Sequence, residues 1–174
     1  MTKKEQDEFW LKFHRFQMRY EIMYTGRINK ALKAQVQQYI YTQNLMDVNS
    51  ADLYLVLLDL YKTTGAAWAY STRKPFVTKA GGQMGFSERV VSIMRQIFEI
   101  ELLNVADDIA TTTKRLIQEV LTEAALEGWS FDEIVKRLVS PDFTAKRARL
   151  IARTETVNAA NAGSMANLKA AGAT

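Results

Sequence analysis

Proline is almost absent from this chain of 174 residues, and its scarcity limits the folds that the chain can adopt. The 2 prolines, Pro75 and Pro141, and the 8 glycines leave long stretches without a residue that breaks helices. From about Glu5 to Gln43 there is no proline and a single glycine, Gly26. Such stretches favour long helices over many short strands, so we expect an all-α fold.

The first long stretch has an amphipathic pattern. Its apolar side chains recur at intervals of four and three residues, as on one face of a helix. This aromatic stripe consists of Phe9, Phe13, Phe16, Tyr20 and Met23. A helix with this stripe needs a partner helix or a partner subunit to cover it, so the stripe is our candidate protein interface.

Caps and glycines predict the remaining elements. A short apolar helix is expected from Ala51 to about Tyr61, and a glycine-rich linker over 63–85. Shorter helices are expected over 87–103, over 111–127 after threonine caps, over 130–139 after a capping box, and from Thr144 onwards. The last one has seven alanines among its final sixteen residues, which permits a close approach to a neighbouring helix. We expect an N-terminal helical region over 1–80, for oligomerisation or docking, and a compact bundle of short helices over 81–174.

Composition excludes several kinds of site. With no cysteine, the chain has no disulfides, thiolate nucleophiles, zinc ribbons or iron–sulfur clusters, and its single histidine, His14, rules out a histidine metal cage. The start of the chain does not resemble a secretory signal, and the longest apolar run, 53–58, is too short to span a membrane. We therefore expect a soluble protein of a reducing compartment that uses no metal or cofactor.

Charge is distributed in three blocks. The net charge is +5 over 1–80, −6 over 81–135 and +5 over 136–174. Basic ends could meet an anionic partner, or each helix could simply carry its own solvated face. The candidate nucleic-acid contacts are Lys146, Arg147, Arg149 and Arg153, of which Lys146, Arg149 and Arg153 follow one helical face.

No catalytic pattern stands out. The glycines of 80–85 lack the lysine and hydroxyl of a phosphate-binding loop, so a linker is the better interpretation. Arg153 and Glu155 are compactly spaced but lie on opposite sides of a helix. No nucleophile–base pair meets the spacing of an active site, so we expect that the chain is not an enzyme.

The stretch from Ala106 to Gly172 resembles the phage Mu F-like minor head proteins, also called phage head morphogenesis proteins. The resemblance follows the chain through 108–117, through 125–134 with Gly128, Trp129 and Ser130, and through 147–156. The most specific block is Ile-Ala-Arg-Thr-Glu-Thr, which contains Arg153, Thr154 and Glu155 and is followed by Asn161-Ala-Gly163.

This resemblance implies a structural component of a tailed-phage head, made in the bacterial cytoplasm and placed inside the capsid. Its implied partners are the portal protein, the shell proteins and, without sequence specificity, double-stranded DNA; several copies are expected, and no membrane. Arg153 and Glu155 are interpreted as members of a buried or inter-helical arginine–glutamate network. Relatives usually continue into a segment with cysteines, whereas this sequence ends at Thr174. The alternative is therefore the N-terminal carrier of a longer protein with a toxin or other enzymatic domain.

Overall fold

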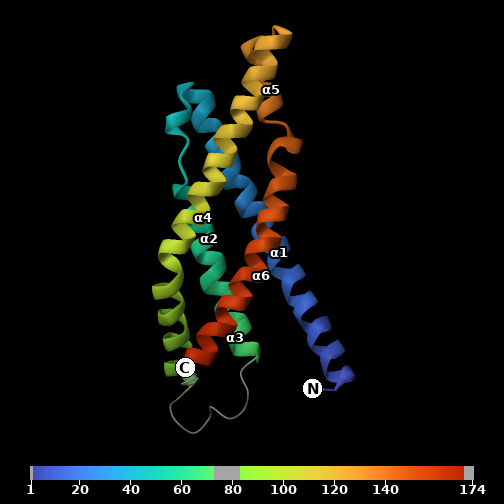
Figure 1. Ribbon diagram of the computed structural model, residues 1–174, viewed down its shortest axis with the longest axis vertical. Helices are drawn as coiled ribbons and strands as arrows, with labels where there is room; N and C mark the ends of the chain where they lie inside the picture. The colour runs from blue at the N-terminus through green and yellow to red at the C-terminus, as the bar shows by residue number, and fades with distance from the viewer. Residues whose placement is uncertain (1, 73–82, 171–174) are drawn as a thin grey trace.

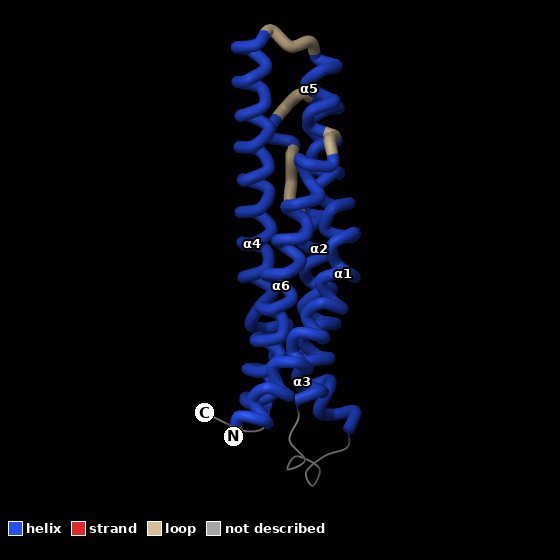
Figure 2. The backbone as a smooth tube through the Cα atoms, turned by 90° about the vertical axis from the view of Figure 1, so that its right-hand side faces the viewer, coloured by secondary structure: helices blue, strands red, loops and turns tan. Residues whose placement is uncertain are grey.

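The structure is a computed structural model that describes residues 2–72 and 83–170. Within these ranges every regular element is a helix, which confirms the all-α fold class. The helices form an elongated bundle in which α4 and α6 run side by side and α1 crosses behind them (Figures 1 and 2). Residues 73–82, which belong to the expected linker, lie outside the described ranges.

The long N-terminal helix, α1 (Lys3–Thr42), confirms the first prediction. It begins with a capping box, in which the backbone amide of Thr2 donates to Glu5 Oε2 at 2.6 Å and that of Glu5 donates to Thr2 Oγ1 at 3.3 Å. It ends where Gln43 adopts a left-handed backbone with φ of 54°. A short 3₁₀ turn, η1 (Leu45–Asp47), follows.

The next segment is helical for longer than the sequence predicts. It consists of α2 (Ala51–Leu60), a π-helical turn η2 (Tyr61–Gly65) and α3 (Ala66–Thr72). The prediction of a linker from residue 63 is therefore wrong for Thr63–Thr72. The glycine that suggested it, Gly65, is buried in a close helix contact, and Trp68 is buried as well.

A single helix, α4 (Gln83–Glu127), replaces the two helices that were expected over 87–103 and 111–127. The threonines predicted as caps bond instead to their own helix. Thr112 and Thr113 donate their hydroxyls to the carbonyls of Asp108 and Ile109, each at 3.0 Å. Threonine is compatible with a helix interior when its hydroxyl bonds to the carbonyl four residues earlier.

Two further helices complete the bundle: α5 (Phe131–Leu138) and α6 (Pro141–Ala170). The predicted capping box of Ser130 and Glu133 is present at the start of α5. The last helix starts earlier than expected, at Pro141, because proline fits the first helical position and its missing N–H costs nothing there. Thr144, the predicted cap, is a buried residue of that helix.

The core consists of two hydrophobic clusters that follow each other along α4. The large cluster takes Leu102 and Ala106 from α4 and residues of α1, α2, α3, η2 and α6. The small cluster lies nearer the end of α4 and is formed by Val36, Tyr39, Val48, Ile117, Val120 and Leu138. The large cluster thus joins residues from both sides of the expected boundary at residue 80.

The alanine-rich helix packs as the sequence predicts. The small residues of α6 that are buried against other elements are Ala148, Ala152, Ala159, Ala160, Ala162, Gly163 and Ala166. At Gly163 the two backbones are in direct contact, since a Cβ there would lie 2.1 Å from the carbonyl oxygen of Gly65. No helix in the described part of the chain is long and apolar enough to cross a membrane.

Candidate functional site

The predicted site residues on α6 meet α4 in a surface groove of about 350 Å³. This α4–α6 groove combines an apolar floor with a few polar groups. Its lining consists of Val105, Asp108, Ile109 and Thr112 from α4, and Arg147, Leu150, Ile151, Thr154 and Glu155 from α6. The structure therefore brings together Arg147, Thr154 and Glu155, three residues that the sequence pointed to.

Arg147 bonds to the interior of the bundle. Its guanidinium donates to Thr113 Oγ1 and to the carbonyl of Ile109, each at 3.0 Å. Burial, together with the nearby Arg115, lowers the pKa of Arg147. These internal bonds compete with any phosphate for the guanidinium, so Arg147 differs from the other cations of the predicted nucleic-acid surface.

The bonds continue from Arg147 into a buried polar layer. Thr113 Oγ1 lies 2.8 Å from Gln35 Oε1, and Gln35 Nε2 donates to the carbonyl of Asn49 at 3.0 Å. This polar layer joins α6, α4, α1 and the segment before α2, and it lies between the large and the small cluster. Sequence reasoning missed it, although one signal was available: Gln35 is a polar residue among the apolar positions Leu32, Val36 and Tyr39.

Glu155 is buried, and its partner is a tyrosine. The hydroxyl of Tyr61 in η2 donates to Glu155 Oε2 at 2.8 Å, and Asn158 Nδ2 lies 3.4 Å from the same oxygen. Burial, followed by the charge and hydrogen bond of Glu155, raises the pKa of Tyr61 far above its usual value, so the phenol keeps its proton. The expected arginine–glutamate pair is absent from the described contacts, because Arg153 is exposed on another side of α6.

The remaining predicted cations lie on the outer face of α6. Lys146 pairs with Asp142 at 3.3 Å, and Arg149 pairs with Glu21 of α1 at 3.1 Å. Arg153 is exposed and belongs to no described ion pair. The Lys146–Asp142 pair is exposed on both sides and exchanges readily with solvent ions, whereas Glu21 is largely buried beneath an exposed Arg149. The three cations themselves all face solvent.

The Gly128-Trp129-Ser130 motif forms the turn between α4 and α5. Gly128 has φ of 72°, a left-handed backbone that favours glycine, and the amide of Trp129 donates to the carbonyl of Ala124 at 2.9 Å. Trp129 packs against the small cluster. This motif therefore stops one helix and starts the next, as its sequence predicts.

The aromatic stripe on α1 finds a partner within the chain. Phe9, Phe13 and Phe16 have ring centroids 5.9, 5.1 and 4.8 Å from that of Trp68 in α3. Tyr20 is buried, whereas Met23 is 44% exposed. Of the two alternatives that the sequence left open, a partner helix therefore covers most of the stripe.

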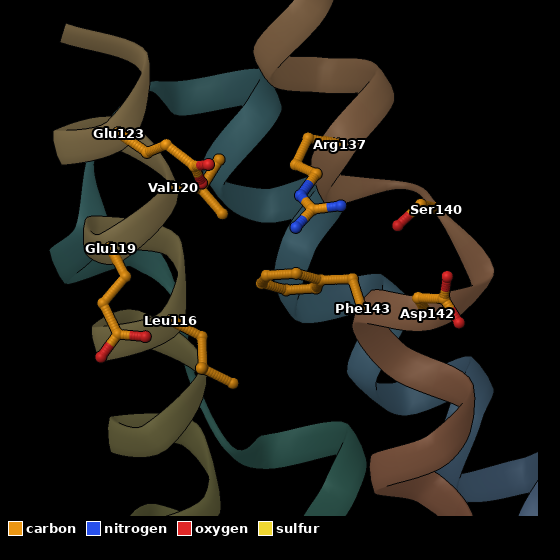
Figure 3. A pocket seen from close by; sticks show the side chains of 8 residues that line it. All are labelled: Leu116, Glu119, Val120, Glu123, Arg137, Ser140, Asp142 and Phe143. Carbon is orange, nitrogen blue, oxygen red and sulfur yellow. The ribbon is translucent and has the colours of Figure 1, made fainter. Parts of the chain in front are cut away.

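A second pocket, of about 240 Å³, was not expected from the sequence. It lies where the end of α4 faces α5 and the start of α6. Figure 3 shows Arg137 pointing into it beside the ring of Phe143, with Glu119 and Glu123 on the opposite wall. Its described lining holds one hydroxyl, Ser140, and no histidine or cysteine, so it offers charge and an aromatic surface rather than an activated nucleophile.

No group of three or more acidic or histidine side chains in the described ranges is arranged to hold a metal ion. Comparison of the chain with protein-family models, curated proteins and solved structures found no match. The resemblance to phage head morphogenesis proteins therefore depends on the sequence motifs alone and stays a prediction.

Proposed function

We propose that the chain is a structural protein of a tailed-phage head, a minor head component that docks other head proteins through its helices. The observation that supports this most directly is the position of the family-like residues. Within 151–156, Ala152, Glu155 and Thr156 are buried between helices, and Gly163 lies against the backbone of Gly65. The motif thus serves helix packing, which is what a structural or docking protein needs from its most specific segment.

The exposed cations of α6 supply a surface for DNA inside the head. Lys146 and Arg149 have side chains that are 82% and 77% exposed, and Arg153 lies on the same outer face. Three cations that neutralise phosphates would make affinity fall with roughly the 2.7 power of the salt concentration.

The experiment that tests the head assignment is quantitative mass spectrometry of purified particles from the phage that encodes the chain. A few copies per particle, in both full and empty heads, are expected for a component bound to portal or shell. Presence in full heads alone would make DNA the main contact. Absence from all particles, with abundance in the lysate, would reject the head assignment.

A separate measurement tests the DNA surface. Fluorescence anisotropy of a labelled duplex over a salt series should give a slope that falls by about 1.8 in the variant with Lys146→Gln and Arg153→Gln. The matched control carries Lys30→Gln and Lys33→Gln, two exposed cations of α1, and should leave the slope unchanged. Equal slopes in all three proteins would remove DNA from the proposal without affecting the head assignment.

A further inference from the structure

Helix α6 carries apolar residues on two opposite sides. One side holds the small residues that pack in the core, such as Ala148, Ala152 and Ala159. On the other side, residues recur at intervals of four, three, four and seven, which is the spacing of one helix face. This outer seam of α6 consists of Leu150, Thr154, Val157, Asn161 and Leu168. Leu150 and Leu168 are 64% and 55% exposed, so the described part of the bundle leaves both ends of the seam open.

The upper part of the seam borders the α4–α6 groove. Leu150 belongs to both, and Ile109 and Ile151 extend the apolar surface from the seam toward α4. Together they form an apolar strip at helical spacing beside a groove of about 350 Å³. A surface of this form can receive the apolar side of another helix, because the side chains of that helix enter the groove at the same spacing.

The undescribed residues of the chain are too few to cover this upper part. Asn167 Nδ2 donates to the carbonyl of Ala69, and Figure 1 shows the end of α3 and the start of α4 at the end of the bundle where α6 finishes. Leu150 lies about 25 Å from Asn167 along the helix, at about 1.5 Å per residue. Residues 73–82 join α3 to α4, so they extend at most about 20 Å from that end. Residues 171–174 extend at most about 14 Å beyond Ala170.

The groove contains a positive charge without a matching negative one. Both described hydrogen bonds of Arg147 go to neutral acceptors, which leaves the other N–H donors of its guanidinium for a further partner. None of the ion pairs in the described ranges includes Arg147. A half-buried charge is costly while it lacks an opposite charge, so a carboxylate placed in the groove would be stabilised there.

The two rims of the groove have opposite charge. On α6, Lys146 and Arg153 are exposed and lie one heptad apart; we call them the α6 rim. On α4, Glu101 and Asp108 are exposed at the same spacing and form the α4 rim. Lys146 keeps an exposed, weak pair with Asp142, which a closer partner can replace. A helix with a heptad repeat places the residues of each edge at this spacing, so its acidic edge has to lie along the α6 rim.

We propose that the upper seam and the α4–α6 groove dock an amphipathic helix of another protein. The apolar side of that helix covers Leu150, Ile151 and Ile109, and a carboxylate on the same side meets Arg147. Its acidic edge lies along the α6 rim and its basic edge along the α4 rim. The proposal deepens the docking function proposed above and rests on it for the kind of partner, whereas the surface itself is a property of the purified chain.

The first test uses three labelled synthetic helices of about three heptads, each with leucines and one glutamate on its apolar side. The mixed peptide has glutamates on one edge and lysines on the other, the second peptide has glutamates on both edges, and the third has lysines on both. Fluorescence anisotropy with the full chain should show the tightest binding for the mixed peptide, and binding at least about tenfold weaker for the lysine peptide. No binding of any peptide at about 1 mM overturns the proposal. Tightest binding by either of the other two overturns the assignment of the edges.

The second test locates the site. Leu150→Asp should weaken binding of the mixed peptide at least about tenfold, because it places a charge in the middle of the apolar contact. The matched control is Leu126→Asp on α4, where the side chain is 83% exposed outside the groove, and it should bind as the wild type does. An equal loss in both variants overturns the location. A labelled DNA duplex should bind Leu150→Asp as well as the wild type, because phosphate contacts do not need the apolar seam.

The third test reverses the α6 rim. With Lys146→Glu and Arg153→Glu both rims are acidic, so the lysine peptide should now bind more tightly than the mixed peptide. The control with Lys30→Glu and Lys33→Glu should keep the wild-type order. An unchanged order in the rim variant overturns the charge arrangement.

All the changed side chains are exposed, so helicity by circular dichroism and the melting temperature should stay close to those of the wild type. Failure of these peptide experiments leaves the head assignment standing, because mass spectrometry of particles measures that assignment separately. Absence of the chain from particles, with peptide binding intact, rejects the head assignment alone.

Discussion

The two halves of α6 are attached to the bundle in opposite ways. In its C-terminal half, Gly163 and its alanine neighbours press against η2 so closely that two backbones touch, and the side-chain bond described there is a long one, from Asn167 Nδ2 to the carbonyl of Ala69 at 3.3 Å. In its N-terminal half, Arg147 reaches into the polar layer and holds α4 by two hydrogen bonds of 3.0 Å. Between these halves, Glu155 accepts a hydrogen bond from the hydroxyl of Tyr61.

This difference separates two physical means of fixing a helix. A contact between small residues fixes the distance between two helices, because no atom can be added between them. It does little to fix how far one helix slides or turns relative to the other. A hydrogen-bonded layer fixes the register, because each donor has to meet one particular acceptor. The polar layer also divides the large cluster from the small one, so it determines which apolar residues belong to each.

The largest change in stability is expected in the C-terminal half of α6. In Gly163→Ala the new Cβ would lie 2.1 Å from Gly65 O and 2.7 Å from Gly65 C, and backbone atoms yield little. We expect a loss of about 3 kcal/mol in the free energy of unfolding, at the upper end of overpacking effects. Urea denaturation followed by circular dichroism measures it. An unchanged midpoint would mean that η2 and α6 are not in backbone contact.

The next largest change in stability is expected in the N-terminal half of α6, at Arg147. Arg147→Met keeps much of the side-chain volume but removes the two hydrogen bonds that the guanidinium donates to Thr113 Oγ1 and to the carbonyl of Ile109, at a cost of about 2 kcal/mol in the free energy of unfolding. The same denaturation experiment applies.

Coupling within the layer can be measured by adding Thr113→Val and Gln35→Leu. The triple variant should lose less than the sum of the three single losses, since the three changed side chains no longer leave one another unpaired. Additive losses would show that the three side chains act independently and that the layer is not a connected unit.

A smaller effect is expected at the junction of the two halves. Tyr61→Phe removes the hydroxyl that donates to Glu155 at 2.8 Å and leaves the carboxylate with Asn158 at 3.4 Å. The expected loss is about 1.5 kcal/mol in the free energy of unfolding. The control is Tyr54→Phe, at a half-buried tyrosine of α2 whose hydroxyl has no described hydrogen bond. A loss of the same size there would remove the special role of the Tyr61–Glu155 bond.

The smallest effect has the opposite sign. Gly26 lies in the middle of α1, and a Cβ there would meet nothing within 4 Å. Gly26→Ala should therefore raise the free energy of unfolding by about 1 kcal/mol through helix propensity alone. Compared with Gly163→Ala, it shows the difference between a helical glycine with free space around it and one in contact with another backbone. Destabilisation by Gly26→Ala would indicate that position 26 has a neighbour outside the part of the chain that the structure describes.

Local signals in the sequence were sufficient for part of this fold. The capping box of Ser130 and Glu133, the left-handed Gly128 and the small residues of α6 each depend on residues close in sequence, and each prediction is confirmed. The linker prediction failed at Gly65, because a glycine that breaks a helix and one that admits a neighbouring backbone look alike in sequence.

The site was less accessible to the same reasoning. Glu155 and Arg147 could be singled out, but their partners could not. Tyr61 lies 94 residues from Glu155, and Thr113 lies 78 residues from Gln35. No spacing rule connects residues so far apart. A charged residue such as Arg147 is also typical of a surface, and its internal role depends on acceptors that only the packed bundle supplies.

The π-helical turn η2 joins α2 and α3 into one continuous helix, and it changes the direction in which the side chains of α3 face relative to those of α2. A π turn holds one residue more than the α-helical turn that it replaces, so the residues after Gly65 are rotated by about 100° relative to an uninterrupted helix. Leu53, Leu57 and Leu60 face the core in the first phase, and Trp68 meets the phenylalanines of α1 in the second. Shortening the rod by the single exposed residue Thr63 would merge the two phases and turn Trp68 away from α1. The aromatic contact between α3 and α1 therefore depends on the number of residues in η2, although no residue of η2 takes part in that contact.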